Sequence, residues 1–208
     1  MELGKTIMFI DNSNIFQNLR CIKPGYRIDY KKLHEKIEER SSIWETYFFA
    51  AEREGSPRDT QTAFFDVLRK ELGYNIVLAT LKVKTISCRK CGEPHEVYLE
   101  KGVDMSLASR FLTLLYSRAF DTAILVTGDG DYADIAREAR RLGRKIIVVS
   151  FRDSLSKELS AVSSLAPVYL DDISGDIELE REPSYDSAPQ QQNSYYQPYP
   201  GGTDECEY

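Results

Sequence analysis

The sequence predicts an α/β domain with a mainly parallel sheet, and three of its features support this prediction. Short apolar runs alternate with segments of helical period over residues 1–174. The run 123–126 is apolar at every position, as in a strand that is buried on both faces of a sheet. A helical pattern follows that run almost at once, as in the crossover connections that join parallel strands.

The expected strands are short and rich in apolar residues. They occupy residues 6–10, 44–51, 75–84, 122–126, 145–151 and 168–170. In the second of these strands, Trp44 and the run Tyr47-Phe48-Phe49 are interpreted as core residues. Residues 85–98 interrupt the alternation of strands and helices, and we interpret them as an insertion that carries two of the four cysteines.

The expected helices begin and end at ordinary start and stop signals. They occupy residues 12–19, 30–40, 56–72, 102–118 and 131–142, with a short helix after residue 154. Asp29 and Ser154 are expected N-caps, and Ser56-Pro57 supplies a cap followed by a proline in the first turn. Gly143 ends the helix that precedes it.

The negative charge is concentrated at the C-terminal end. The 208 residues carry a net charge of −6, but residues 175–208 hold eight acidic residues and one basic residue, a net −7. The domain before them therefore carries +1, which is compatible with nucleic-acid binding without arguing for it. Residues 184–202 are rich in proline, glutamine, serine and tyrosine and have no apolar period. We therefore expect 175–208 to be a disordered tail, either simply solvated or able to bind a partner through its tyrosines.

No segment of the sequence has the pattern of a targeting or membrane-spanning element. The apolar run after Lys5 is short and ends in Asp11, unlike a signal peptide. No window is long and apolar enough for a transmembrane helix, so no membrane contact is expected. Four cysteines are too few for a disulfide scaffold, which favours reduced thiols and a cytoplasmic protein.

Four aspartates lie where expected strands end or expected helices begin. Asp11 ends the first strand, and Asp129 and Asp131 follow the central strand. Asp104 opens the helix that follows the insertion, on a stripe of apolar residues, and is expected to face inward. Ligands bind at the carboxyl edge of an open α/β sheet, so we expect the four acids to converge there. Each of them alone also fits a turn or a helix cap.

Several carboxylates at one point repel each other unless a cation neutralises them. Mg²⁺ or Mn²⁺ is the expected cation because both are hard ions that prefer oxygen ligands. Such ions commonly hold a phosphate, activate water and stabilise the leaving oxygen. The acids therefore predict a metal-dependent site that acts on a phosphate.

Three segments resemble the signatures of a known family. They are Phe9-Ile10-Asp11-Asn12-Ser13-Asn14, Lys101-Gly102-Val103-Asp104 and Leu125-Val126-Thr127-Gly128-Asp129-Gly130-Asp131-Tyr132. Over about residues 5–172 the chain is similar to the NYN domain, and more closely to its LabA-like branch within the PIN-like nucleases. The resemblance implies a Rossmann-like three-layer α/β/α sandwich. It also implies an endoribonuclease that cleaves RNA with Mg²⁺ or Mn²⁺.

The resemblance implies roles for individual residues. Asp11, Asp104 and Asp129 would be the main metal ligands. Asp131 would be a further ligand or would position the attacking water. Asn14 would orient Asp11 or contact the scissile phosphate.

Two positions depart from the family pattern. Near the end of the resemblance, where the family tends to have Ala-Asp, the chain has Ala166-Pro167. Six residues after Asp104, where the family often has a second acid, the chain has Arg110. An arginine removes a ligand but can hold a phosphate. Arg110 is therefore a candidate substrate contact, and so are Lys101 and Thr127, which lie in the segments that resemble the family. The departure at Arg110 keeps a second interpretation open, in which the chain is a catalytically weak or inactive module that binds RNA or a protein partner.

Four other classes of protein that have a diagnostic motif after a strand fit this sequence less well. An adhesion-type metal site needs Asp-x-Ser-x-Ser, a spacing that Ser13 and Asn14 do not keep. A phosphatase of the haloacid-dehalogenase type needs Asp-x-Asp, but residue 13 is serine. A topoisomerase-primase site needs glutamate where Asp11 stands. A nucleotide-binding Rossmann protein needs Gly-x-Gly-x-x-Gly after the first strand or a P-loop, and the sequence has neither.

Cys88, Cys91 and His95 have the spacing of half a zinc site. A closed structural site needs four ligands, so Cys21, Cys206 or a second subunit must supply the fourth. Two such half-sites from two chains would make a zinc-bridged homodimer. An exposed hairpin with two reduced thiols fits the same residues, and the sequence leaves both interpretations open.

Overall fold

The structure is a computed structural model that describes residues 3–53, 58–87, 94–100 and 102–180. Its strands are β1 (Thr6–Asp11), β2 (Ile43–Arg53), β3 (Asn75–Ser87), β4 (Pro94–Glu100), β5 (Thr122–Val126), β6 (Lys145–Ser150) and β7 (Val168–Tyr169). They form one sheet in the order β4-β3-β2-β1-β5-β6-β7. All neighbouring pairs are parallel except β3 with β4. The predicted, mainly parallel sheet is confirmed.

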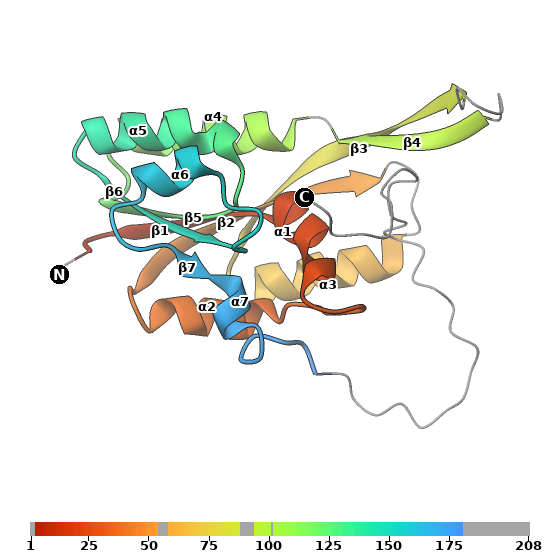
Figure 1. The fold of residues 1–208 in the computed structure, drawn as a ribbon, viewed down its shortest axis with the longest axis horizontal. Coiled ribbons are helices and arrows are strands. Elements are labelled where there is room, and N and C mark those ends of the chain that lie inside the picture. Colours follow the sequence, from red (N-terminus) through yellow and green to blue (C-terminus); the bar gives the residue numbers. More distant parts are fainter. Residues whose placement is uncertain (1–2, 54–57, 88–93, 101, 181–208) are drawn as a thin grey trace.

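Helices cover both faces of the sheet. They are α1 (Asn12–Asn18), α2 (Tyr30–Glu38), α3 (Arg58–Lys70), α4 (Val103–Tyr116), α5 (Ala133–Arg141), α6 (Lys157–Val162) and α7 (Leu170–Ile173), with single 3₁₀ turns η1 (Leu19–Cys21) and η2 (Gly130–Tyr132). Helices α4, α5 and α6 lie on one face, and α2, α3 and α7 lie on the other (Figure 1). This arrangement confirms the three-layer α/β/α sandwich.

Strand β1 shows how the sequence builds the two cores. All six of its residues are buried. Because successive side chains of a strand point to opposite faces, Ile7 and Phe9 belong to the core under α4 and α5, whereas Met8 and Ile10 belong to the core under α2 and α3. Burying each such side chain contributes about 1.5–3 kcal/mol. An apolar residue is therefore favoured at every position of this central strand.

The expectation that Trp44 is a core residue is wrong. Its side chain is 55% exposed, and the ammonium group of Lys5 lies over its ring. Strand β2 pairs with β1 at Ile43 and then at Glu45, so the register shifts at Trp44. The extra residue of such a bulge is displaced from the regular alternation of faces, which explains its exposure. The neighbouring run Tyr47-Phe48-Phe49 is buried as expected.

The N-cap of α6 also differs from the expected one. The hydroxyl of Ser156, rather than that of Ser154, accepts the backbone N–H of Leu159 at 3.1 Å. The Ser154 hydroxyl lies 3.1 Å from that of Ser150, at the end of β6. Helix α6 is therefore capped by a serine, as expected, but by the serine two residues further along the chain.

The expected insertion at 85–98 is largely an antiparallel hairpin. Strand β3 continues to Ser87, and β4 returns beside it from Pro94. The hairpin projects beyond the rest of the sheet (Figure 1). His95 pairs with Ile86 along the ladder, but Cys88 and Cys91 lie outside the described residues, so the zinc half-site stays a prediction.

None of the helices in the described ranges is both long and apolar enough to cross a membrane. The longest of the helices described above, α4, has 14 residues, whereas a bilayer core requires about 20.

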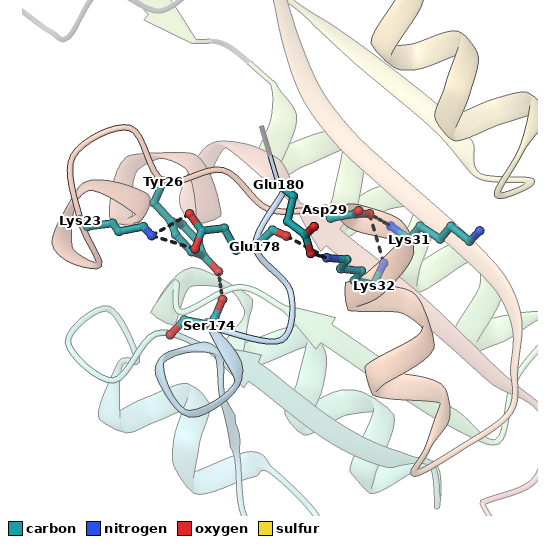
Figure 2. A network of polar contacts seen from close by, with 8 residues as sticks. All are labelled: Lys23, Tyr26, Asp29, Lys31, Lys32, Ser174, Glu178 and Glu180. Atoms are coloured by element: carbon teal, nitrogen blue, oxygen red, sulfur yellow. Dashed lines mark hydrogen bonds and ion pairs between the residues drawn. The ribbon is translucent and has the colours of Figure 1, made fainter. Parts of the chain in front are cut away.

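The chain beyond Ser174 packs on the domain as far as Glu180, although the predicted domain boundary lies at Ser174. The backbone N–H of Asp29 donates to the carbonyl of Ile177 at 2.8 Å, and that of Leu179 donates to the carbonyl of Arg27 at 2.9 Å. The Tyr26 hydroxyl donates to the carbonyl of Ser174 at 2.6 Å (Figure 2). Residues 181–208 lie outside the described ranges, so the disordered tail stays a prediction.

Charge complementarity accompanies this packing. Each acidic side chain of the segment pairs with a lysine of the facing loop or helix: Lys23 with Glu178, Lys32 with Glu180, and Lys36 with Asp176. The first two pairs are drawn in Figure 2. Exposed ion pairs contribute only about 0–1 kcal/mol each, so the buried Ile177 is expected to contribute more to holding the segment.

Replacing Ile177 by alanine is expected to lower the free energy of unfolding by about 2–4 kcal/mol, because this side chain is only 1% exposed. Leu179→Ala is the matched control, since Leu179 is in the same segment but 43% exposed; its expected effect is below about 1 kcal/mol. Urea unfolding of both variants measures the difference. Equal effects would mean that the segment is not held through Ile177.

Candidate functional site

The expected convergence of strand ends occurs between β1 and β5. Ile10 of β1 lies opposite Val126 of β5, so the residues that follow, Asp11 and Thr127, meet at the carboxyl edge of the sheet. The strand order reverses at this pair, since β2 lies on one side and β6 on the other. Ligands of open α/β sheets bind at such a switch point.

Asp11 is held at this edge by contacts from two parts of the chain. Asp11 is buried, with 2% of its surface exposed. As the N-cap of α1, it accepts the backbone N–H of Asn14 on Oδ1 at 3.2 Å. Its Oδ2 accepts the hydroxyl of Thr127 at 3.3 Å and that of Tyr132 at 3.2 Å. One carboxylate oxygen therefore serves the local helix, and the other faces the residues after β5.

Asp104 reaches the same place from α4. Its Oδ1 accepts the Tyr132 hydroxyl at 3.1 Å. The residue is nevertheless exposed, so the expectation that it faces inward is wrong. The buried residues of α4 are Val103, Leu107, Phe111 and Leu115. Asp104 lies one position away from that stripe, about 100° around the helix, which places it at the rim of the site.

Asp129 and Asp131 shape the turn that follows β5. The backbone N–H of Asp129 donates to the Thr127 hydroxyl at 3.2 Å, and the Asp129 carboxylate accepts the backbone N–H of Asp131 at 2.9 Å. Asp129 is thereby the N-cap of η2 and is half-buried, whereas Asp131 is exposed. The Thr127 hydroxyl thus connects the turn to the carboxylate of Asp11.

Asn14 joins the two turns of the site. Its side-chain oxygen accepts the backbone N–H of Gly128 at 2.9 Å. Its contact with Asp11 is made through its backbone N–H. The structure therefore gives the Asn14 side chain the task of positioning the turn after β5.

Tyr132 is a residue of the site that the sequence interpretation did not single out. Its ring is buried at 1% exposure, and its hydroxyl contacts both Asp11 and Asp104. Burial, together with the two nearby carboxylates, raises the pKa of Tyr132 well above its usual range, so the hydroxyl keeps its hydrogen. The sequence offers only a weak signal for this role, a tyrosine directly after two acids in a strand-to-helix turn, because the contact with Asp104 depends on how α4 packs.

The donor set suits a hard cation, although the four acids are not gathered around one point. Within the described ranges, no three His, Cys, Asp or Glu side chains form a group that could hold a metal ion. Asp11 and Asp104 are nevertheless joined by one hydroxyl. That hydroxyl has a single hydrogen, which cannot satisfy two carboxylate acceptors fully. Mg²⁺ is commonly bound by one or two carboxylates plus water and phosphate oxygens, so this pair fits such an ion.

The candidate substrate contacts are dispersed. Thr127 is buried between Asp11 and the backbone of Asp129. Arg110 is exposed, and its guanidinium lies 5.5 Å from the ring centre of Tyr47. Lys101 lies outside the described residues. Of the two candidates in the described part of the chain, Thr127 is the one whose contact with the acidic site is seen.

The arginines of α5 and the following loop are engaged with other groups. Arg141 pairs with Glu138 at 2.7 Å and helps to lower the pKa of Glu138 to about 2. Arg144 pairs with Asp121, which precedes β5 and so lies at the edge of the sheet opposite the acids. This end of α5 therefore lies toward the edge of the sheet opposite the acids.

Comparisons with known proteins agree with the fold. A protein of unknown function from Vibrio parahaemolyticus has a similar crystal structure, with a TM-score of 0.61 and 20% identity over 86% of this chain and 98% of that one. MurG from Acinetobacter baumannii has a TM-score of 0.38 and 11% identity over 78% of this chain and 40% of that one, which is too low to bear on the fold. A search of curated proteins found no match.

The sequence model of the NYN domain family matches residues 5–169. This range covers most of the residues that the structure describes. The matched range includes Asp11, Asp104, Asp129 and Asp131. The NYN domain is a PIN-like nuclease domain, which supports a nuclease type of function and a hydrolase type of activity. The chain belongs to the NYN domain family.

Proposed function

We propose that the chain is a metal-dependent endoribonuclease of the LabA-like branch, which cleaves phosphodiester bonds of RNA with Mg²⁺ or Mn²⁺. The observation that carries this proposal is the meeting of three distant segments at one hydroxyl: Tyr132 contacts Asp11 at 3.2 Å and Asp104 at 3.1 Å. We also propose that the protein is cytoplasmic, which is supported only by its small number of cysteines.

Each residue has a proposed role that follows from its place. Asp11 and Asp104 would hold the ion, with Asp129 as a further ligand. The chemistry that a bound divalent ion supplies at such a site is neutralisation of phosphate charge and activation of water. Asp131 is exposed beside Asp129 and would orient the attacking water. Thr127 and Asn14 hold the turn that carries these two acids.

The burial of the acids suggests how RNA would approach. Asp11 is almost inaccessible, whereas Asp104 and Asp131 are exposed. A phosphate would therefore reach the acids from the side of Asp104 and Asp131. The family and the chemistry of the site, rather than a general positive charge, support RNA as the substrate, because the domain carries only +1.

Asp129→Asn is expected to reduce the cleavage of single-stranded RNA by about 10²-fold or more, because it removes a charged group at the site of proton transfer and ion binding. The assay compares rates with Mn²⁺, with Mg²⁺ and with EDTA. Asp134→Asn is the matched control, since Asp134 is an exposed aspartate of α5 that pairs with Arg137. Cleavage that survives either Asp129→Asn or EDTA would rule out the proposed mechanism.

A second candidate function is supported by Arg110. The chain has this exposed arginine where the family often has an acid, and its guanidinium lies against Tyr47. A catalytically inactive module that binds RNA or a protein would tolerate that change better than a nuclease would. Calorimetric titration that shows RNA and metal binding without turnover would select this function.

The remaining parts of the proposal concern partners and zinc. A homodimer bridged by zinc at Cys88, Cys91 and His95, and a protein partner for the tail, rest on the sequence alone. Of the other expected zinc ligands, Cys21 is exposed and Cys206 lies outside the described residues. Metal analysis of the purified protein and of Cys88→Ser would decide whether zinc is bound.

A further inference from the structure

We infer that Tyr132 is a positioning residue that holds the carboxylates of Asp11 and Asp104 at the spacing at which they receive the divalent ion, an inference that rests on the proposed function. The two acids come from different layers of the fold. Asp11 ends a strand of the sheet, and Asp104 lies in the first turn of a helix that covers it. The Tyr132 hydroxyl is the described group that contacts both of them.

The ring of Tyr132 belongs to the core and anchors the hydroxyl. The ring is 1% exposed and lies in the core under α4 and α5, in a cluster that includes Phe9, Val103 and Leu107. A side chain packed this closely has few alternative rotamers, so its hydroxyl is fixed relative to β1 and α4. A phenylalanine would fill the same core equally well. The hydroxyl is therefore needed by the acids rather than by the packing.

The contacts of the hydroxyl support the same conclusion. A buried tyrosine hydroxyl normally has a hydrogen-bond partner, and one acceptor would satisfy its hydrogen. This hydroxyl has two carboxylate neighbours at almost equal distances, 3.2 Å to Asp11 and 3.1 Å to Asp104. One hydroxyl hydrogen shared between two carboxylate oxygens draws both toward one point without satisfying either acceptor fully. Carboxylates brought together in this way repel each other, and a divalent cation would relieve that repulsion.

The two acids differ in how much they depend on this contact. Asp11 is also held by Asn14 and Thr127. Asp104 is exposed, and its contact with Tyr132 is the hydrogen bond that the structure gives its side chain. Without the hydroxyl, Asp104 would lose its fixed place and would have to be ordered each time an ion binds. The ion's affinity should therefore fall, while the reaction of the loaded site should change little.

The test measures Mn²⁺ binding directly, by electron paramagnetic resonance of the free ion during titration of the full chain. Tyr132→Phe is expected to weaken the Mn²⁺ affinity about 10-fold, as is usual when a group that orients a ligand is removed. In an RNA cleavage assay, the Mn²⁺ concentration for half-maximal rate should rise by the same factor. The kcat at saturating Mn²⁺ should change less than about threefold, whereas a general loss of structure would lower it.

Tyr74→Phe is the matched control, because the Tyr74 hydroxyl is also buried, bonds to the carbonyl of Tyr30, and touches none of the acids. Its Mn²⁺ affinity should equal that of the wild type. Should Tyr132→Phe fail to fold, Tyr132→Met fills the core with a flexible apolar side chain and serves the same comparison.

The outcomes separate this inference from the proposed function. Mn²⁺ binding that is lost in Asp11→Asn but unchanged in Tyr132→Phe would overturn the role of Tyr132 alone. If the wild type shows no Mn²⁺ binding that depends on Asp11, both the role of Tyr132 and the proposed function are wrong. Weakened binding in Tyr132→Phe, with normal binding in Tyr74→Phe, supports both.

Discussion

Replacing Asp11 by asparagine is expected to reduce RNA cleavage about 10³-fold while leaving the fold intact. The loss reflects removal of the buried charge that would hold the ion, whose contribution to such reactions is several kcal/mol. The fold should survive because asparagine caps a helix as well as aspartate does and keeps the acceptor for the backbone N–H of Asn14. Single-turnover rates with Mn²⁺ and thermal unfolding measure the two effects.

The control for this prediction is Asp29→Asn. Asp29 is likewise the N-cap of a helix, where it accepts the backbone N–H groups of Lys31 and Lys32, and it has no contact with the acidic site. Its cleavage rate should remain within about twofold of the wild type, as expected for a conservative change away from a site. An Asp11→Asn variant with the wild-type rate, or one that fails to fold, contradicts the role given to Asp11.

Replacing Gly128 by alanine is expected to cost about 3 kcal/mol or more of stability and to abolish cleavage. A methyl group at this position would lie 2.2 Å from the carbonyl oxygen of Ser154 and 2.7 Å from the hydroxyl of Ser150. The first of these is backbone, so the turn after β5 must move to make room. Because that turn carries Asp129, the acids would be displaced together with it. Calorimetry should show a transition lowered by roughly 6–12 °C.

Gly175→Ala is the matched control for this substitution. A methyl group there meets no atom within 4 Å, and its backbone is not in the left-handed region. Its effect on stability should be below about 0.5 kcal/mol. If Gly128→Ala is as stable and as active as Gly175→Ala, the packing of the turn against Ser154 is not required for the site.

The sheet and its layers could be predicted because periodicity depends on local residue order. The apolar run 123–126 predicts a strand buried on both faces, and all five residues of β5 are buried. Trp44 could not be placed in the same way. A bulge shifts the register between β1 and β2 at that residue, and a bulge depends on how two distant strands pair.

The site was predictable at the level of strand ends and less so at the level of side chains. The switch-point rule places Asp11 beside the turn that carries Asp129, as the structure does. For Asp104, the sequence interpretation places the apolar stripe of the helix one position away from the buried stripe. It therefore predicts a buried side chain, whereas Asp104 is exposed. Such an error is small in sequence but amounts to about 100° around a helix.

Tyr132 illustrates a different limit. An aromatic residue at the start of a helical pattern is typical of a core residue, and the ring of Tyr132 does lie in the core. Its hydroxyl has a role only because α4 brings Asp104 to it from elsewhere in the chain. Contacts between segments that are distant in sequence are set by the tertiary packing, and so a single sequence does not reveal them.

The most direct measurement is the anomalous diffraction of crystals soaked in Mn²⁺. We expect an anomalous difference peak in contact with the carboxylates of Asp11 and Asp104 in the wild type, and no peak there in Asp11→Asn. A wild-type crystal with no peak at these carboxylates, or an equal peak in Asp11→Asn, would contradict a metal-dependent nuclease site at this edge of the sheet.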